Sequence, residues 1–255
     1  MITLKSPREI EKMREAGQLL SKVFEVIKPH IKEGVSTYAI SKVAEDFIRT
    51  NGGIPTFKGY GGFSGAICTS INDMVIHGIP SKKVILKNGD LLKVDAGVTL
   101  HGYVADAART YFVGEVSDEA KKLAEVTKLS FFEGIKLIKP GVHLGDIGAR
   151  IQEVIESNGY SVVKEYTGHG VGQQLHEDPY VPNYGIKGTG LILKEGMTLA
   201  IEPMVCQKSA KLYVIKDGWG AKTVDKGLTA HYENTIAITK DGVEILTISK
   251  EELDG

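Results

Sequence analysis

The sequence has few of the features that mark secreted, membrane-spanning or nucleic-acid-binding proteins. Its only two cysteines, Cys68 and Cys206, form no CxxC pair, which argues against a disulfide framework and a zinc ribbon. No apolar run approaches the ~20 residues of a membrane helix. The 31 basic and 32 acidic side chains nearly cancel, so neither nucleic acid nor a membrane surface is favoured as a partner. Because the amino terminus also lacks a signal peptide's apolar stretch, we expect a cytoplasmic protein.

A hairpin that carries two acids is the first feature that the sequence does contain. Apolar runs at 91–95 and 103–113 predict its two strands, and the glycine-flanked segment 97–102 predicts the connection between them. Each strand holds one aspartate, Asp95 or Asp106. An aspartate in an apolar strand costs free energy unless another group compensates its charge.

Two interpretations of these aspartates are open. In the first, each caps a turn or meets an arginine, and Arg109 is close enough in sequence to serve one of them. In the second, the two carboxylates are hard oxygen ligands of a metal ion. The rest of the chain favours the second interpretation.

Four helices are predicted from their capping residues and their apolar periodicity. A serine–proline pair at 6–7 marks the start of the first helix, whose apolar face continues to Pro29. Ser117 marks the start of the third. The second and fourth helices are predicted at 37–50 and 144–157, and each is followed by an Asn-Gly pair. Most of the chain after the fourth helix has the character of strands and turns.

The two halves of the chain resemble each other at a constant offset of 107 residues (138 − 31 = 107). We therefore expect a single domain over 1–255 that contains an internal repeat, approximately 6–116 and 117–247, with each copy built as helix–helix–hairpin. The matched segments are Ile31–Val35 with Ile138–Val142, Asn51-Gly52 with Asn158-Gly159, and Ile85–Gly89 with Ile192–Gly196.

The acids of the hairpin follow the same repeat. The offset of 107 places Asp95 on Glu202 (202 − 95 = 107), and with 20 further residues inserted Asp106 falls on Glu233 (233 − 106 = 127). Two copies that face each other would bring four carboxylates to one centre. Like charges at contact distance raise each other's pKa, and a pair of divalent cations would neutralise them. The sequence therefore predicts an α+β fold around a dinuclear metal site.

A glycine-flanked segment at 166–179 carries two histidines, His169 and His176. A neutral imidazole binds transition metals and also relays protons. The surrounding glycines allow the backbone to approach a ligand closely. A lone histidine is more often structural, but two histidines in such a segment, beside four predicted ligand acids, favour a functional role.

The sequence resembles a known family, the type I methionine aminopeptidases, over essentially the whole chain. The segment Tyr166-x-Gly-His-Gly-Val-Gly-x-x-x-His176, which continues through Val181-x-Asn183-Tyr184, follows the type I signature. The order of the candidate site residues also matches that family, and it is His77, Asp95, Asp106, His169, His176, Glu202 and Glu233.

The resemblance implies a fold and an activity. The fold is the pita-bread fold, in which two pseudo-symmetric helix–helix–hairpin halves surround a curved antiparallel sheet. The activity is removal of the amino-terminal methionine from nascent proteins, with preference for a small second residue. Type II enzymes carry a long insertion between the two glutamates, and the 31 residues from Glu202 to Glu233 leave no room for one (233 − 202 = 31).

The resemblance also implies a role for each site residue. Asp106 and Glu233 would bridge two divalent ions, and the complete metal set would be Asp95, Asp106, His169, Glu202 and Glu233. The catalytic set would be His77, His176 and Glu202, in which Glu202 transfers the proton and His176 donates to the scissile carbonyl oxygen. His77 and His176 would also contact the substrate, and the methionine pocket would consist of Tyr60, Phe63, Cys68 and Trp219, although Cys68, Tyr60 and Phe63 also fit ordinary packing.

Several points remain open in the sequence. The carboxylate-rich ligand set suits Mn, Fe(II) or Co(II) at least as well as Zn. Leu175 stands where bacterial relatives often carry an aromatic residue. We expect a monomer that meets nascent chains near the ribosome and binds neither nucleic acid nor membrane. The alternatives are a proline-specific aminopeptidase of the same fold, which usually has an extra amino-terminal domain, and an inactive binding member, which should have lost ligands.

Overall fold

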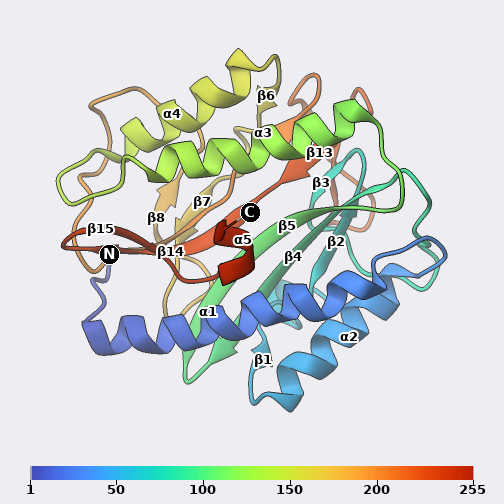
Figure 1. The fold of residues 1–255 in the computed structure, drawn as a ribbon, viewed down its shortest axis with the longest axis horizontal. Coiled ribbons are helices and arrows are strands. Elements are labelled where there is room, and N and C mark those ends of the chain that lie inside the picture. The colour runs from blue at the N-terminus through green and yellow to red at the C-terminus, as the bar shows by residue number, and fades with distance from the viewer. Residues whose placement is uncertain (1, 255) are drawn as a thin grey trace.

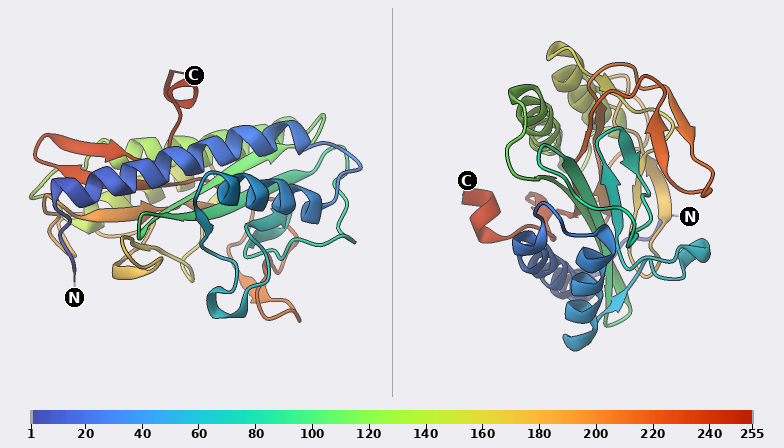
Figure 2. Two further views of the ribbon diagram at one scale, coloured as in Figure 1. Left: turned by 90° about the horizontal axis from the view of Figure 1, so that it is seen from below. Right: turned by 90° about the vertical axis from the view of Figure 1, so that its right-hand side faces the viewer.

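A long, curved antiparallel sheet runs through the molecule and carries the main helices on one face (Figures 1 and 2). The computed structural model describes residues 2–254, apart from the side chains of Glu251 and Asp254. The strand order is β1-β4-β5-β14-β9-β7-β8, with β15 on β14 and β2 on β4. These strands are β1 Ile54–Pro55, β2 Cys68–Ile71, β4 Leu91–Leu100, β5 Tyr103–Phe112, β7 Gly168–Gly170, β8 Glu177–Val181, β9 Thr198–Ile201, β14 Glu233–Thr239 and β15 Gly242–Ile245.

Two small three-stranded sheets flank the large one, with the orders β13-β10-β6 and β11-β12-β3. The first holds the chain just beyond β9 against the chain just before β14, so it continues the central pairing. The strands are β3 Met74–Ile76, β6 Ser161–Val162, β10 Met204–Cys206, β11 Leu212–Val214, β12 Ala221–Thr223 and β13 Thr229–His231.

The four predicted helices are confirmed, and they pack as two pairs, α1 with α2 and α3 with α4 (Figure 1). The side chains of Ser36 and Ser117 accept hydrogen bonds from the first turns of α2 and α3, which fixes where these helices begin. None of the described helices is both long and apolar enough to cross a membrane. The helices are α1 Pro7–Ile27, α2 Thr37–Thr50, α3 Asp118–Ile135, α4 Leu144–Ser157 and a short α5 Lys250–Asp254 that was not predicted.

The central hairpin is longer than predicted. The expected connection at 97–102 was wrong, because β4 continues to Leu100 and only His101 and Gly102 form the turn. Both turn residues have a positive φ, 51° and 79°, as a two-residue hairpin turn of type I′ requires. Gly97 lies inside the strand, where a Cβ would come within 2.8 Å of the Phe57 ring. The extended pairing places both aspartates well inside the sheet.

The pseudo-symmetry of the two halves is visible in one backbone hydrogen bond just before α2 and in its counterpart just before α4. Gly34 donates its N–H to the carbonyl of Leu86 at 2.9 Å, and Gly141 donates to Leu193 at 2.9 Å. The two donors and the two acceptors are each separated by the predicted offset of 107 residues (141 − 34 = 107 and 193 − 86 = 107). The two halves therefore use the same connection between the start of a helix and the strand hairpin.

The second strand of each hairpin follows a different offset from the one predicted. Gly97 pairs with Asp106 in the first half, and Met204 pairs with His231 in the second. The offsets are therefore 107 on the first strand and 125 on the second (204 − 97 = 107, 231 − 106 = 125). The overlay of Asp106 on Glu233 was wrong by two residues. A shift of two residues keeps a side chain on the same face of a strand, so the acids still converge.

Candidate metal centre

Four carboxylates from two hairpins line one pocket on the sheet. Asp95 and Asp106 lie on β4 and β5, Glu202 directly follows β9, and Glu233 is the first residue of β14. They converge because β14 lies between β5 and β9, with Glu233 opposite Ala108 of β5. The structure thus brings together the four acids that the repeat singled out. Asp106 and Glu233 are almost fully buried, at 4% and 2% exposure.

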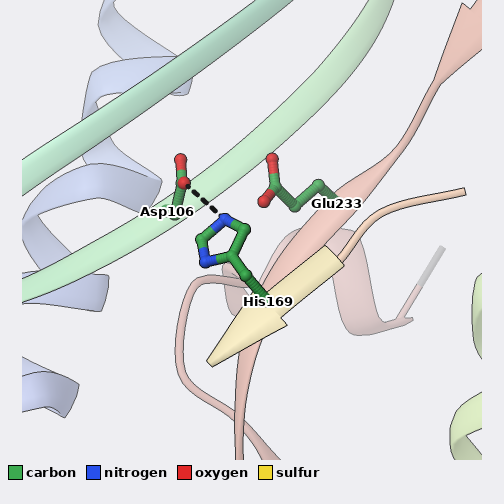
Figure 3. Close-up of side chains that lie close together, drawn as sticks. All are labelled: Asp106, His169 and Glu233. Atoms are coloured by element: carbon green, nitrogen blue, oxygen red, sulfur yellow. Dashed lines mark ion pairs between the residues drawn. The ribbon is translucent and has the colours of Figure 1, made fainter. Parts of the chain in front are cut away.

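His169 on β7 completes this group of acids (Figure 3). Its Nε2 lies 3.5 Å from Oδ2 of Asp106 and 3.7 Å from Oε1 of Glu202. Its Nδ1 lies 2.8 Å from the carbonyl oxygen of Gly170, which can only accept a hydrogen bond. Nδ1 therefore carries a proton, and Nε2 faces the carboxylates, which is the orientation of a metal-binding imidazole.

The acids have no protein cation to neutralise them. Burial, followed by the neighbouring carboxylates, raises the pKa of Asp95, Glu202 and Glu233 well above the usual range. One buried oxygen of Asp95 and one of Asp106 accept no hydrogen bond. Among residues 2–254, no Lys or Arg forms an ion pair with any of the four acids. Such oxygen-rich, uncompensated sites bind divalent cations.

Arg109 does not compensate the hairpin aspartates, so the first interpretation of these residues was wrong. Its guanidinium donates to the backbone carbonyl of Glu233 at 2.6 Å and to Oδ1 of Asn234 at 2.8 Å. It also pairs with Glu252 of α5 at 2.7 Å. Because Arg109 faces away from the carboxylates, it anchors β14 and α5 rather than neutralising the acids.

An apolar pocket adjoins the acids, and it contains each residue predicted for side-chain binding, namely Tyr60, Phe63, Cys68 and Trp219. Trp219 packs edge-on against Phe63 with ring centroids 5.1 Å apart. Cys68 pairs with Asp95 across β2 and β4, so pocket and acids share one strand. Burial raises the pKa of the Cys68 thiol well above its usual value, so it acts as a neutral, soft side chain. Sequence reasoning did not include Phe57, Ile76, Tyr166 and Thr167, which also line this pocket.

The two remaining predicted histidines border the acids and the pocket. Burial lowers the pKa of His77 below its usual value and that of His176 to about 4, the nearby His169 adding to the second effect. Both rings are therefore neutral near pH 7. His77 has a positive φ of 61°, unusual for a residue other than glycine, and its ring packs edge-on against Tyr166 at 5.6 Å. Such strain is common at functional sites.

His231 was missed by the sequence analysis. Its Nε2 lies 3.6 Å from Oε2 of Glu202 and 4.0 Å from Oε2 of Glu233. Burial lowers its pKa to about 3, so the ring is neutral. The available signal was its position two residues before Glu233, because alternate strand residues lie on the same face.

The fold and the site together define a class of protein. Two pseudo-symmetric halves around a curved antiparallel sheet, with buried acids and an imidazole beside an apolar pocket, are the pita-bread architecture of metal-dependent hydrolases.

Comparisons with known proteins specify the family. The model of metallopeptidase family M24 matches residues 11–240. A methionine aminopeptidase of Clostridium acetobutylicum is 51% identical over 97% of this chain and 99% of its own length. The crystal structure of methionine aminopeptidase from Rickettsia prowazekii has a TM-score of 0.96 at 44% identity, and the match covers 97% of this chain and 100% of that one. An Xaa-Pro dipeptidase from Bacillus anthracis has a TM-score of 0.75 at 28% identity, over 96% of this chain but only 62% of its own. This chain belongs to metallopeptidase family M24.

Proposed function

We propose that the protein is a methionine aminopeptidase, which hydrolyses the first peptide bond of nascent polypeptides that begin with methionine and carry a small second residue. The observation that carries this proposal is the apolar pocket directly beside the four acids, with Cys68 of the pocket paired to Asp95. A side chain in this pocket would hold the adjoining peptide bond against the acids. The chain would act as a cytoplasmic monomer near the ribosome, without binding nucleic acid or membrane.

The residues present fit two divalent cations. Asp95, Asp106 and Glu233 would hold one ion, and Asp106, Glu233, His169 and Glu202 would hold the other. Divalent cations at such a site lower the pKa of a bound water and polarise a carbonyl oxygen. Carboxylate and imidazole ligands together suit Mn, Fe(II), Co(II) or Zn.

The side chains around the acids supply the proton transfers and the orientation of the substrate. The Glu202 carboxylate would take the proton of the attacking water and deliver it to the leaving amine. His176 would donate its Nε2 proton to the carbonyl oxygen as negative charge develops there. His77, held beside the pocket by its packing on Tyr166, would contact the amide next to the scissile bond.

The pocket accounts for the choice of methionine. Phe63 and Trp219 offer ring edges and faces, and Cys68 adds a soft neutral sulfur. A thioether gains from contact with aromatic rings and bends easily to fill an irregular space. Charged or branched side chains would lose solvation or clash with the backbone near the pocket entrance.

The proposal is tested with three matched tripeptides that begin with methionine, alanine or an Xaa-Pro pair, assayed with protein purified without chelator. We expect rapid cleavage of the methionyl peptide, loss of that cleavage on chelation, and recovery on addition of Mn, Co(II) or Fe(II). Faster cleavage of the Xaa-Pro peptide would assign the chain to the proline-specific branch instead. No cleavage of any peptide by metal-loaded protein would identify an inactive member.

A further inference from the structure

His231 occupies the position in the second half that Asp106 occupies in the first. The pairing of Met204 with His231 is the counterpart of Gly97 with Asp106, at offsets of 107 and 125 (204 − 97 = 107, 231 − 106 = 125). Asp106 points into the acid cluster from β5. The pseudo-symmetry therefore places a second side chain that can bind metal on the opposite flank of the same cluster, and this side chain is an imidazole.

Nε2 of His231 faces carboxylates in the same way as Nε2 of His169. Nε2 of His169 faces two carboxylates, Asp106 and Glu202, at 3.5 and 3.7 Å. Nε2 of His231 also faces two carboxylates, Glu202 and Glu233, at 3.6 and 4.0 Å. These separations are too long for hydrogen bonds. They agree with ligand atoms that share one ion at about 2.0–2.2 Å from each.

Glu202 lies between the two imidazoles and presents a different oxygen to each. Oε1 faces His169 and Oε2 faces His231. Nε2 of His231, one oxygen of Glu202 and one of Glu233 all lie within 4.8 Å of one another. Both carboxylates thus have an oxygen available on the side of His231.

The ring of His231 is buried and has no partner in the described part of the chain. Its side chain is 1% exposed, and neither Nδ1 nor Nε2 makes a hydrogen bond. An unpaired buried nitrogen is costly. The backbone is fixed, because its N–H donates to Oγ1 of Thr110 at 3.0 Å and its carbonyl accepts from the same hydroxyl at 2.9 Å. Thr110 of β5 thus fixes the backbone from which the His231 ring extends towards the acids.

We propose that His231 is a metal ligand, and that its Nε2, with Glu202 and Glu233, forms a site for a further divalent cation beside the proposed pair of ions. The proposal rests on the metal centre proposed above. One nitrogen and two carboxylate oxygens suit the same ions, Mn, Co(II), Fe(II) or Zn. Glu202 and Glu233 would then bind this ion in addition to the pair, because the two oxygens of a carboxylate together offer about four lone pairs.

The test compares the full chain with His231→Leu, and uses the exposed His30→Leu as the matched control. Titration of metal-free protein with Mn(II) would give the number of ions bound. Electron spin-echo spectra of the loaded protein would report the imidazole nitrogens on Mn(II). We expect His231→Leu to bind one ion fewer and to lose one of two imidazole signals, while His30→Leu matches the original chain.

Thermal unfolding of the metal-free proteins controls for misfolding. His231→Leu should unfold at the same temperature as the original chain or higher, because the ring has no hydrogen bonds to lose. Equal ion numbers and equal imidazole signals would overturn the proposal, as would a general fall in affinity with no ion lost. If either result were found while methionyl peptides were still cleaved, only the proposal for His231 would fail. The proposed function would be unaffected.

Discussion

The phenolic oxygen of Tyr60 lies 2.7 Å from Nδ1 of His176. A phenol is a good donor, so Nδ1 accepts and the ring proton is left on Nε2. The His176 ring also packs against His169, with centroids 4.4 Å apart, which holds it beside the acid cluster. Tyr60 therefore fixes both the orientation of His176 and the position of its proton.

Tyr60→Phe should lower kcat by about tenfold and change KM little. Loss of one hydrogen bond costs about 0.5–1.5 kcal/mol, and the aromatic ring that lines the pocket is kept. Steady-state kinetics on one methionyl tripeptide measure both constants. A rise in KM without a fall in kcat would show that Tyr60 only binds the side chain and does not position His176.

His176→Ala should reduce kcat much more than it raises KM. Loss of a donor to a developing oxyanion costs roughly 10²–10³ in rate, or about 3–4 kcal/mol. His176→Asn, which keeps an N–H donor, serves as the conservative comparison and should retain more of the rate. Equal losses in the two variants would speak against donation by this residue.

Asp106→Asn should weaken metal binding and abolish turnover while the fold is retained. Asp106 is 4% exposed, and one of its oxygens accepts no hydrogen bond. The amide removes one of several mutually repelling charges, so the metal-free variant should unfold at a higher temperature than the metal-free original. Metal titration and thermal unfolding separate these effects. Full turnover in the variant would exclude Asp106 as a bridging ligand.

The metal-free protein should lose stability as the pH rises from about 5 to 8. The pKa values of Asp95, Glu202 and Glu233 are raised in the folded chain by burial and by one another. Above the unfolded pKa of about 4, the folded state therefore binds more protons, and the free energy of unfolding falls by up to about 1.4 kcal/mol per pH unit for each such proton. Saturating Mn(II) should reverse the slope, because the metal binds the ionised acids. The measurement is thermal unfolding in the presence of chelator across this pH range. An unfolding temperature that rises with pH would contradict the presence of uncompensated buried acids.

The local features of the fold could be predicted because they depend on short-range rules. The cap at Ser36 and the end of α2 at Thr50 follow from residues adjacent in sequence. The acid cluster could also be predicted, because the repeat at an offset of 107 is visible in the residues themselves, as in Asp95 and Glu202.

Strand register could not be obtained in the same way. The turn at His101 and Gly102 depends on two positive φ angles, and the segment 97–102 contains glycine at both ends, so the sequence did not locate the turn within it. Acids were matched to acids, whereas the backbone pairing matches Asp106 to His231. His231 was missed for that reason. The pairing of β10 with β13 places His231 opposite Met204.

We expect Leu175 to affect selectivity among apolar side chains. It is buried, at 5% exposure, and lines the pocket with Phe63 and Trp219. One methylene in such a pocket is worth about 1–3 kcal/mol, so norleucyl peptides should be cleaved appreciably and alanyl peptides poorly. Valyl peptides should fail, because the branched Cβ places its bulk at the pocket entrance.

A phenylalanine at this position tests the shape of the pocket. Leu175→Phe adds a flat ring beside the thioether and narrows the space for a branched side chain, so it should sharpen the preference for methionine over leucine or leave it unchanged. The measurement is kcat/KM for methionyl, norleucyl, leucyl and alanyl forms of one tripeptide, with the original chain as reference. A Leu175→Phe variant that favours leucine would contradict the expected narrowing of the pocket. Equal cleavage of the alanyl and methionyl peptides by the original chain would contradict a methionine pocket. Filling the pocket with the methionine side chain would then contribute nothing to stabilising the transition state.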